Sequence, residues 1–202
     1  MSAQTSKSRR FGRIESRDLT QAAVFAGLLA ALGLPGTLTI GPSGVPITLQ
    51  TLGVMLAGSI LGPRKGALAI ALFATLAIAG LPILAGGRTG LVALASPTAG
   101  FFVGWFPAVI VIGLLTALMM PRYRVVWGIG INIVGGMVVI YMFGTAGLML
   151  RTDLSWWAAL STNGIYIPGD IAKAVLCGFV AAQVHRARPG LIRPWRTART
   201  HD

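Results

Sequence analysis

Hydrophobic residues occur in six long runs along this chain, separated by short stretches rich in Gly, Pro and basic residues. A helix needs about 20 apolar residues to cross the hydrocarbon core of a bilayer. The first two runs are shorter, so we expect them to be tilted, interrupted by Gly or Pro, or sheltered by protein. The pattern predicts an all-α integral membrane protein, a bundle of six transmembrane helices in a lipid bilayer. The segments are Leu19–Leu34, Ile47–Leu61, Gly66–Leu84, Pro97–Met120, Val125–Leu150 and Ile167–Val184.

Basic residues lie almost entirely on one side of the predicted membrane. Fourteen Lys and Arg flank the segment ends that share a side with both chain termini, whereas Arg88 and Arg151 lie on the other side. Because positively charged loops stay in the cytoplasm, both termini are predicted to be cytoplasmic. We expect a basic N-terminal tail over residues 1–18, one membrane domain over 19–184 and a basic C-terminal tail over 185–202. A cleaved signal peptide is the alternative for the first segment, although no small-residue cleavage site clearly follows it.

Composition supports a membrane location and argues against other classes. Hydrophobic residues make up 54% of the 202 residues and charged residues 11%, with a mean hydropathy of +0.76, whereas soluble domains are about 25% charged. The net charge of +12 lies in tails and short loops, so no nucleic-acid partner is expected. Only one acid lies within a predicted segment and both histidines lie in the C-terminal tail. We therefore expect neither a metal site nor an intramembrane enzyme.

The sixth segment carries an acid and a base three residues apart, Asp170 and Lys173. Either one alone at a helix centre in lipid would cost about 2.5–3.5 kcal/mol, so each needs a partner or a water-filled cavity. Helical geometry places the two side chains about 60° apart, where they can pair or hold a polar ligand. Arg88 lies in the same outer half, and together these groups favour an anion there. The alternative is an ion pair that ties this helix to its neighbour.

Uncharged polar residues enter the second segment from a loop over residues 36–47 that is rich in Gly, Pro and hydroxyl groups. Thr48, Gln50 and Thr51 can offer neutral hydrogen bonds inside the membrane. Their two possible roles, ligand contacts and polar contacts between helices, are about equally supported. Three aromatic residues, Phe101, Phe102 and Trp105, are candidates for the apolar wall of a site, with ordinary core or lipid contact as the slightly favoured alternative.

Small residues form a row along the first segment. Ala22, Ala26 and Ala30 recur every four residues, with Ala23, Gly27 and Ala31 alongside. Such a surface permits the close approach of another helix. The approaching helix can belong to this bundle or to a partner protein.

Several motifs together resemble those of the BioY family. They are Val45-Pro46-Ile47-Thr48-Leu49-Gln50-Thr51, Leu61-Gly62-Pro63-Arg64-Lys65-Gly66, Pro97-Thr98 with Gly100 and Gly104, and Ile167-Pro168-Gly169-Asp170 with Lys173. The similarity spans residues 20–184. One motif departs from the family pattern, because Ser96-Pro97-Thr98-Ala99-Gly100-Phe101 replaces the usual Gly-Pro-Thr-Gly-Gly-Tyr. The change removes two glycines and a tyrosine hydroxyl.

The resemblance implies the biotin-specific S-component of an energy-coupling-factor vitamin transporter in a bacterial plasma membrane. It implies biotin as the transported ligand, no cofactor, and as partners a transmembrane coupling subunit with two ATP-binding cassette ATPases. The sequence itself lacks the P-loop pattern for ATP. The alternatives are an S-component for another small vitamin, a stand-alone biotin transporter and a passive channel. The residues expected to bind biotin are Asp170, Lys173, Arg88, Gln50, Thr48 and Phe101, and those expected to dock the coupling subunit are Ala22, Ala26 and Ala30.

Overall fold

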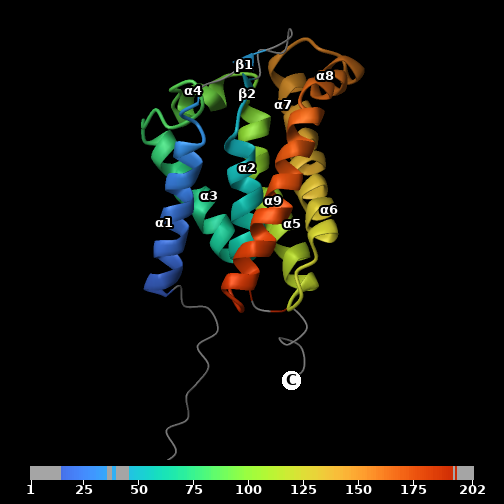
Figure 1. The fold of residues 1–202 in the computed structure, drawn as a ribbon. Coiled ribbons are helices and arrows are strands. Elements are labelled where there is room, and N and C mark those ends of the chain that lie inside the picture. Colours follow the sequence, from blue (N-terminus) through green and yellow to red (C-terminus); the bar gives the residue numbers. More distant parts are fainter. Residues whose placement is uncertain (1–14, 36–37, 40–45, 193, 195–202) are drawn as a thin grey trace, which may run out of the picture.

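The computed structural model describes residues 15–35, 38–39, 46–192 and 194. In this part of the chain, long helices stand side by side in one bundle (Figure 1). Two short strands, β1 (Leu38–Thr39) and β2 (Pro46–Ile47), pair antiparallel with Leu38 opposite Ile47. The helices are α1 (Ser16–Ala31), α2 (Gln50–Leu56), η1 (Ala57–Leu61), α3 (Gly62–Ile78), α4 (Gly90–Ala95), α5 (Ala99–Met119), α6 (Val125–Ile133), η2 (Val134–Val139), α7 (Ile140–Arg151), α8 (Trp156–Thr162), η3 (Asn163–Ile165) and α9 (Ile167–Ala187).

Four helical stretches among the described residues are long and apolar enough to cross a membrane. They are Gln50–Ile78, Ala99–Met119, Val125–Arg151 and Ile167–Ala187. The apolar pattern therefore predicted membrane-length helices correctly in the second half of the chain. The remaining long helix, α1, has 16 residues.

The stretch Gln50–Ile78 changes direction at Gly62. Gly62 has a φ of +79°, a conformation that glycine adopts without the penalty of a Cβ. A Cβ added to Gly66 would lie 3.0 Å from the carbonyl oxygen of Ala57, although residues nine apart in a straight helix are separated by about 13 Å. The chain therefore folds back, and α2 with η1 forms one arm and α3 the other. The break falls between Leu61 and Gly66, where the apolar pattern predicted it.

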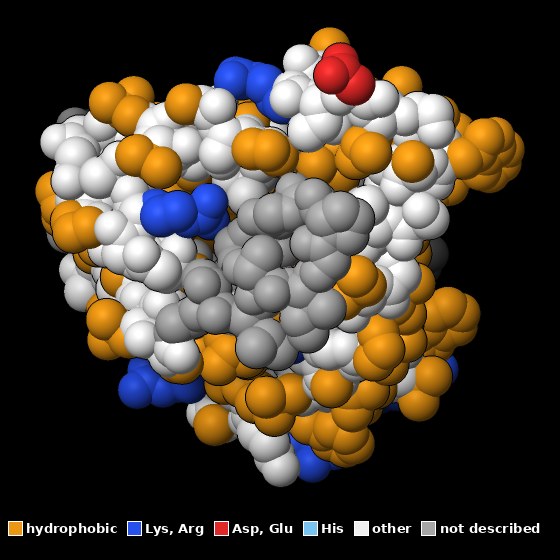
Figure 2. Space-filling view, turned by 90° about the horizontal axis from the view of Figure 1, so that it is seen from above, with side chains coloured by type: hydrophobic (Ala, Val, Ile, Leu, Met, Phe, Trp, Pro, Cys, Tyr) orange, Lys and Arg blue, Asp and Glu red, His pale blue; other side chains and the backbone are white. Residues whose placement is uncertain are grey.

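The two ends of the bundle carry different parts of the chain. The first residue of α1 and the last residues of α9 lie at one end, here called the terminal end (Figure 1). The opposite end carries β1, β2, α4 and α8 (Figure 1). It is called the pocket end because a pocket lies there. Seen from the pocket end, hydrophobic side chains surround much of the outer edge and charged side chains are sparse (Figure 2). The predicted tails largely lie outside the described residues, as does most of the predicted loop over residues 36–47.

Helix α1 turns its predicted docking face inward. Ala22 and Ala26 are 0% and 5% exposed and join the buried core, and Ala30 is partly buried against it. Side chains covered by the protein's own helices cannot form a contact surface for another protein, so the docking prediction for Ala22 and Ala26 is wrong. The neighbouring row, Ala23, Gly27 and Ala31, is exposed.

Helices α5 and α7 cross closely because glycines face each other. A Cβ added to Gly100 would lie 2.8 Å from the Cα of Gly147, and one added to Gly144 would overlap the ring of Phe101. Real side chains cannot occupy these positions without moving a helix apart from its neighbour. The crossing therefore sets Phe101 against α7, at the pocket end of the bundle.

Candidate functional site

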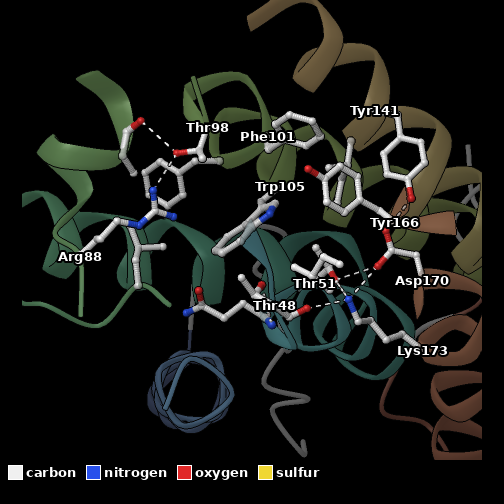
Figure 3. A pocket seen from close by; sticks show the side chains of 16 residues that line it. Thr48, Thr51, Arg88, Thr98, Phe101, Trp105, Tyr141, Tyr166, Asp170 and Lys173 are labelled. Carbon is white, nitrogen blue, oxygen red and sulfur yellow. Dashed lines mark hydrogen bonds and ion pairs between the residues drawn. The ribbon is translucent and has the colours of Figure 1, made fainter. Parts of the chain in front are cut away.

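A pocket lies at the pocket end, between α2, α5, α7, α9 and the segment that joins α3 to α4. All six residues predicted to contact the ligand line it: Asp170, Lys173, Arg88, Gln50, Thr48 and Phe101. Figure 3 shows two polar clusters on opposite sides of this pocket, with Trp105 between them. We call them the acidic pole, around Asp170, and the arginine pole, around Arg88.

The acidic pole is organised by the first turn of α9. Asp170 and Lys173 are 4% and 8% exposed, and Lys173 Nζ lies 2.8 Å from Asp170 Oδ1. The pairing on one helical face agrees with the sequence prediction. Thr51 Oγ1, at the start of α2, also donates a hydrogen bond to Asp170 Oδ1, at 3.4 Å. An ion pair this deeply buried compensates both charges within the protein.

Lys173 uses all three of its N–H donors on the protein. Besides Asp170, Nζ donates to the carbonyl oxygen of Thr48 at 2.6 Å and to Thr51 Oγ1 at 3.0 Å. The Thr48 hydroxyl instead accepts a hydrogen bond from the backbone N–H of Gln50. Thr48 therefore lines the pocket, but it contacts Lys173 through its carbonyl group, which any residue type would carry. Its contact with a ligand stays a prediction.

Tyr141 completes the acidic pole. Its hydroxyl donates a hydrogen bond to Asp170 Oδ2 at 2.7 Å. The sequence motifs do not include this residue, which lies in the middle of the run Val125–Leu150 among apolar side chains. An isolated phenol deep within a predicted span was the available signal, because a buried tyrosine hydroxyl usually requires a partner.

The arginine pole is held by a tight turn. Leu84 and Arg88 exchange two backbone hydrogen bonds around Gly86 and Gly87, whose φ values are +79° and +69°. The Arg88 side chain donates to the carbonyl of Ala85 at 3.3 Å and to Thr98 Oγ1 at 3.4 Å. These bonds use two of its five N–H donors, and the other three have no partner in the described part of the chain. Burial lowers the pKa of the Arg88 guanidinium from its usual value.

Gln50 lines the pocket, but its amide group is bonded to the backbone. Nε2 donates to the carbonyls of Leu29 and Ile83, at 3.1 and 3.0 Å, and Oε1 accepts from the N–H of Ala85 at 2.9 Å. Both amide donors are thereby used. Gln50 is 1% exposed and connects α1, α2 and the turn that carries Arg88.

Aromatic rings form the wall between the poles. Trp105 and Phe102 are 6% and 9% exposed and meet edge to face, with ring centroids 5.4 Å apart. Phe101 meets Tyr166 in the same manner, at 6.2 Å. All four line the pocket, so Phe102 and Trp105 are not lipid-facing. Tyr166 is likewise buried, with 6% of its surface exposed.

The pocket contains few groups suited to other chemistries. No set of three His, Cys, Asp or Glu residues that could hold a metal ion occurs among the residues that the structure describes. Asp170 is the one carboxylate among the described pocket-lining residues. With polar groups at its two sides and aromatic rings between them, the pocket is suited to binding a molecule with separated polar ends.

Comparison with known proteins gives a consistent result. The model of the BioY family matches residues 3–190. The chain is 42% identical to "Biotin transporter BioY" of Rhodobacter capsulatus, over 87% of this chain and 97% of that protein. It is 40% identical to "Biotin transporter BioY" of Rhizobium etli, over 85% and 94% of the two chains. Both relatives are named as transporters rather than enzymes.

A solved structure is also similar. It is described as the S-component for biotin from an ECF-type ABC transporter, and it superimposes with a TM-score of 0.81 at 27% identity, covering 86% of this chain and 95% of the other. The sequence motifs, the fold and the family model lead to the same assignment. This chain is a member of the BioY family.

Proposed function

We propose that this chain is the biotin-binding S-component of a bacterial vitamin uptake transporter. The observation that carries the proposal is the arrangement of the pocket, with an acidic pole and an arginine pole separated by aromatic rings (Figure 3). Biotin has the matching order of groups: a ureido ring with two N–H donors, an apolar thiophane ring and chain, and a terminal carboxylate. The names of the relatives and of the similar structure support the same ligand.

The ureido ring is assigned to the acidic pole. An ionised carboxylate only accepts hydrogen bonds, so Asp170 suits the ureido N–H groups and repels the carboxylate of biotin. Lys173 offsets the charge of Asp170 and does not itself bond to the ligand, because its three N–H donors already have partners in the protein. Phe101, Phe102 and Trp105 then cover the apolar part of the molecule.

The carboxylate is assigned to Arg88. Three N–H donors of its guanidinium remain available in the described structure, and the planar group can bind a carboxylate through two parallel hydrogen bonds. An anion at this position also offsets the cost of burying the positive charge. Gln50 and Thr48 act through the backbone that they hold rather than by direct contact with the ligand.

Transport across the membrane requires a wider arrangement. We infer six spans, formed by α1, by α2 with η1, by α3, by α5, by α6 with η2 and α7, and by α9, with both termini in the cytoplasm in accordance with the positive-inside rule. A transmembrane coupling subunit and two ATP-binding cassette ATPases supply the energy. The exposed row Ala23, Gly27 and Ala31 is the proposed contact for the coupling subunit, since small residues allow close helix packing in lipid. No cofactor is expected.

Equilibrium binding of labelled biotin to the purified full-length protein tests the proposal. We expect tight, saturable binding that other vitamins such as thiamine and riboflavin do not compete away. Asp170→Asn should weaken binding by about 30-fold or more, because truncating a buried, hydrogen-bonded charge pair costs 2–5 kcal/mol. Absence of saturable binding would show that the chain is a passive channel or binds another molecule.

Dependence on the ATPases is tested separately by biotin uptake into cells that express the chain with or without a coupling module. Uptake that needs the module and its ATP hydrolysis supports the S-component role. Equal uptake without it would instead identify a stand-alone transporter.

A further inference from the structure

The two oxygens of Asp170 have different partners. Oδ1 accepts hydrogen bonds from Lys173 and Thr51, and Oδ2 accepts one from Tyr141. A carboxylate offers about four acceptor sites. The described residues therefore occupy three, and about one remains for a ligand. Which direction that site faces depends on how the plane of the carboxylate is held.

Tyr141 is the partner best placed to hold that plane. Its oxygen lies 2.7 Å from Oδ2, within the distance range of strong hydrogen bonds between a hydroxyl and a carboxylate. Its ring is partly buried and packs against the buried core around Leu148 and Tyr166 as well as against the cores of the neighbouring helices. A ring fixed on several sides keeps its hydroxyl in one position, whereas Lys173 has a flexible stem.

The direction of Tyr141 depends on the π-helical segment η2. Asn132, on the preceding helix α6, is 0% exposed. Tyr141 follows it by nine residues, and in a regular α-helix this spacing would place the Tyr141 side chain about 180° from that of Asn132, facing away from the bundle. A π turn takes up about one residue more than an α turn, so the two side chains instead differ by about 80°. Both then point into the protein, while Val138 and Met142 are 49% and 64% exposed on the outer face. Short π segments of this kind are frequent at functional sites.

We propose that Tyr141, aimed by η2, is a positioning residue that sets the specificity of the pocket for a ligand with a urea N–H group. It fixes the Asp170 carboxylate so that its remaining acceptor site faces the ligand. This inference rests on the proposed function, because it takes biotin as the occupant of the pocket.

The test compares three ligands on the full-length protein in detergent: biotin, biotin methyl ester and biotin methylated on a ureido nitrogen. Tyr141→Phe keeps the ring and removes the hydroxyl. It should weaken the binding of biotin and of its methyl ester by the same factor, about 10-fold, because the freed Asp170 carboxylate must then be ordered at the expense of binding, by up to what the lost hydrogen bond supplied. Discrimination between biotin and the N-methylated ligand should fall by about the same factor. Tyr123→Phe, in the turn between α5 and α6, is the matched control and should leave all three affinities unchanged.

A double-mutant cycle separates positioning from general packing. In the Asp170→Asn background, Tyr141→Phe should change biotin affinity by less than 2-fold, because its partner is already altered. Equal weakening of all three ligands, independent effects of the two substitutions, or a change below 2-fold in the single variant would each overturn the inference. The ratio of the affinities for biotin and the N-methylated ligand remains informative if the variant is less stable. A loss of folded protein lowers the apparent affinity for both ligands by the same factor, which cancels in the ratio.

Failure of the proposed function gives a different result. Wild-type protein that binds none of the three ligands would refute the biotin assignment itself, and with it the role of Tyr141. Wild-type protein that binds biotin tightly and loses it on Asp170→Asn, but not on Tyr141→Phe, would refute only the role of Tyr141.

Discussion

The pocket end and the terminal end both contain buried polar groups within apolar helices, but these groups are used differently. At the terminal end, Ser59 Oγ donates to Asn132 Oδ1 at 3.1 Å, and Asn132 Nδ2 donates to the carbonyl of Gly128 at 2.8 Å. His185 Nε2 lies 2.8 Å from the carbonyl oxygen of Ser59, and its ring stacks on Tyr123. The polar groups of Ser59, Asn132 and His185 satisfy one another across α6, α9 and η1, whereas the Tyr123 hydroxyl is buried with no hydrogen-bond partner among the described residues.

At the pocket end, by contrast, the unused hydrogen-bonding groups line a cavity. Arg88 retains three N–H donors among the described contacts, and Asp170 retains about one acceptor site. Burial of a polar residue in a span is therefore not sufficient evidence of a binding site. The useful criterion is whether its donors and acceptors are used up by the protein or remain directed into a cavity.

The largest expected effect is that of Lys173→Met. It leaves Asp170 charged and without its cation, and removes a donor to Thr48 and Thr51, so biotin affinity should fall by about 100-fold or more. Lys65→Met is the matched control at the terminal end, where Lys65 donates to Gln21 and to the Leu191 carbonyl. It should lower the melting temperature in detergent but change biotin affinity by less than 2-fold. Similar losses of affinity in both variants would remove the distinction between the two ends.

Insertion of one alanine after Val138 should have the next largest effect. The longer segment places ten residues between Asn132 and Tyr141, and with η2 still taking up one of them it turns Tyr141 by about 100° relative to Asn132. We expect biotin affinity to fall by about 30-fold, because either the acidic pole or the network at the terminal end must lose its contact. Val138→Ala keeps the length and should bind normally. A monodisperse insertion variant with wild-type affinity would contradict the role given to η2.

Gln50→Ala should have a smaller and more selective effect. It removes the hydrogen bonds to Ile83 and Ala85 that hold the turn carrying Arg88. We expect biotin to bind about 10-fold more weakly and biotin methyl ester, which lacks the carboxylate charge, to change little. Gln21→Ala, a glutamine at the terminal end, is the control. Equal weakening of both ligands would mean that Gln50 does not act through Arg88.

The smallest effect on binding is expected for Ser59→Ala. Asn132 Oδ1 then loses its hydrogen-bond donor in a fully buried position, which costs about 1–3 kcal/mol of stability. The melting temperature should fall by several degrees, while biotin affinity stays within 2-fold of wild type. Loss of affinity without loss of stability would indicate that the terminal end contributes to the site after all.

Sequence alone determined the features that depend on spacing along one helix. The apolar runs identified the long helices, the three-residue spacing placed Asp170 and Lys173 together on α9, and the motifs indicated the family. The six residues selected for ligand contact all line the pocket. Periodicity and burial cost are sufficient for these predictions because both are local properties of the chain.

The tertiary structure alone decided which groups meet across helices. Tyr141 bonds to Asp170, and the carbonyl of Thr48 accepts from Lys173. The amide of Gln50 bonds to backbone atoms. Ala22 and Ala26 face inward instead of toward a partner. The rotation of each helix about its axis and its distance from its neighbours fix these contacts. In this protein those quantities are set by glycine-to-glycine crossings and by two π-helical segments, whose effect appears only when the helices pack against one another.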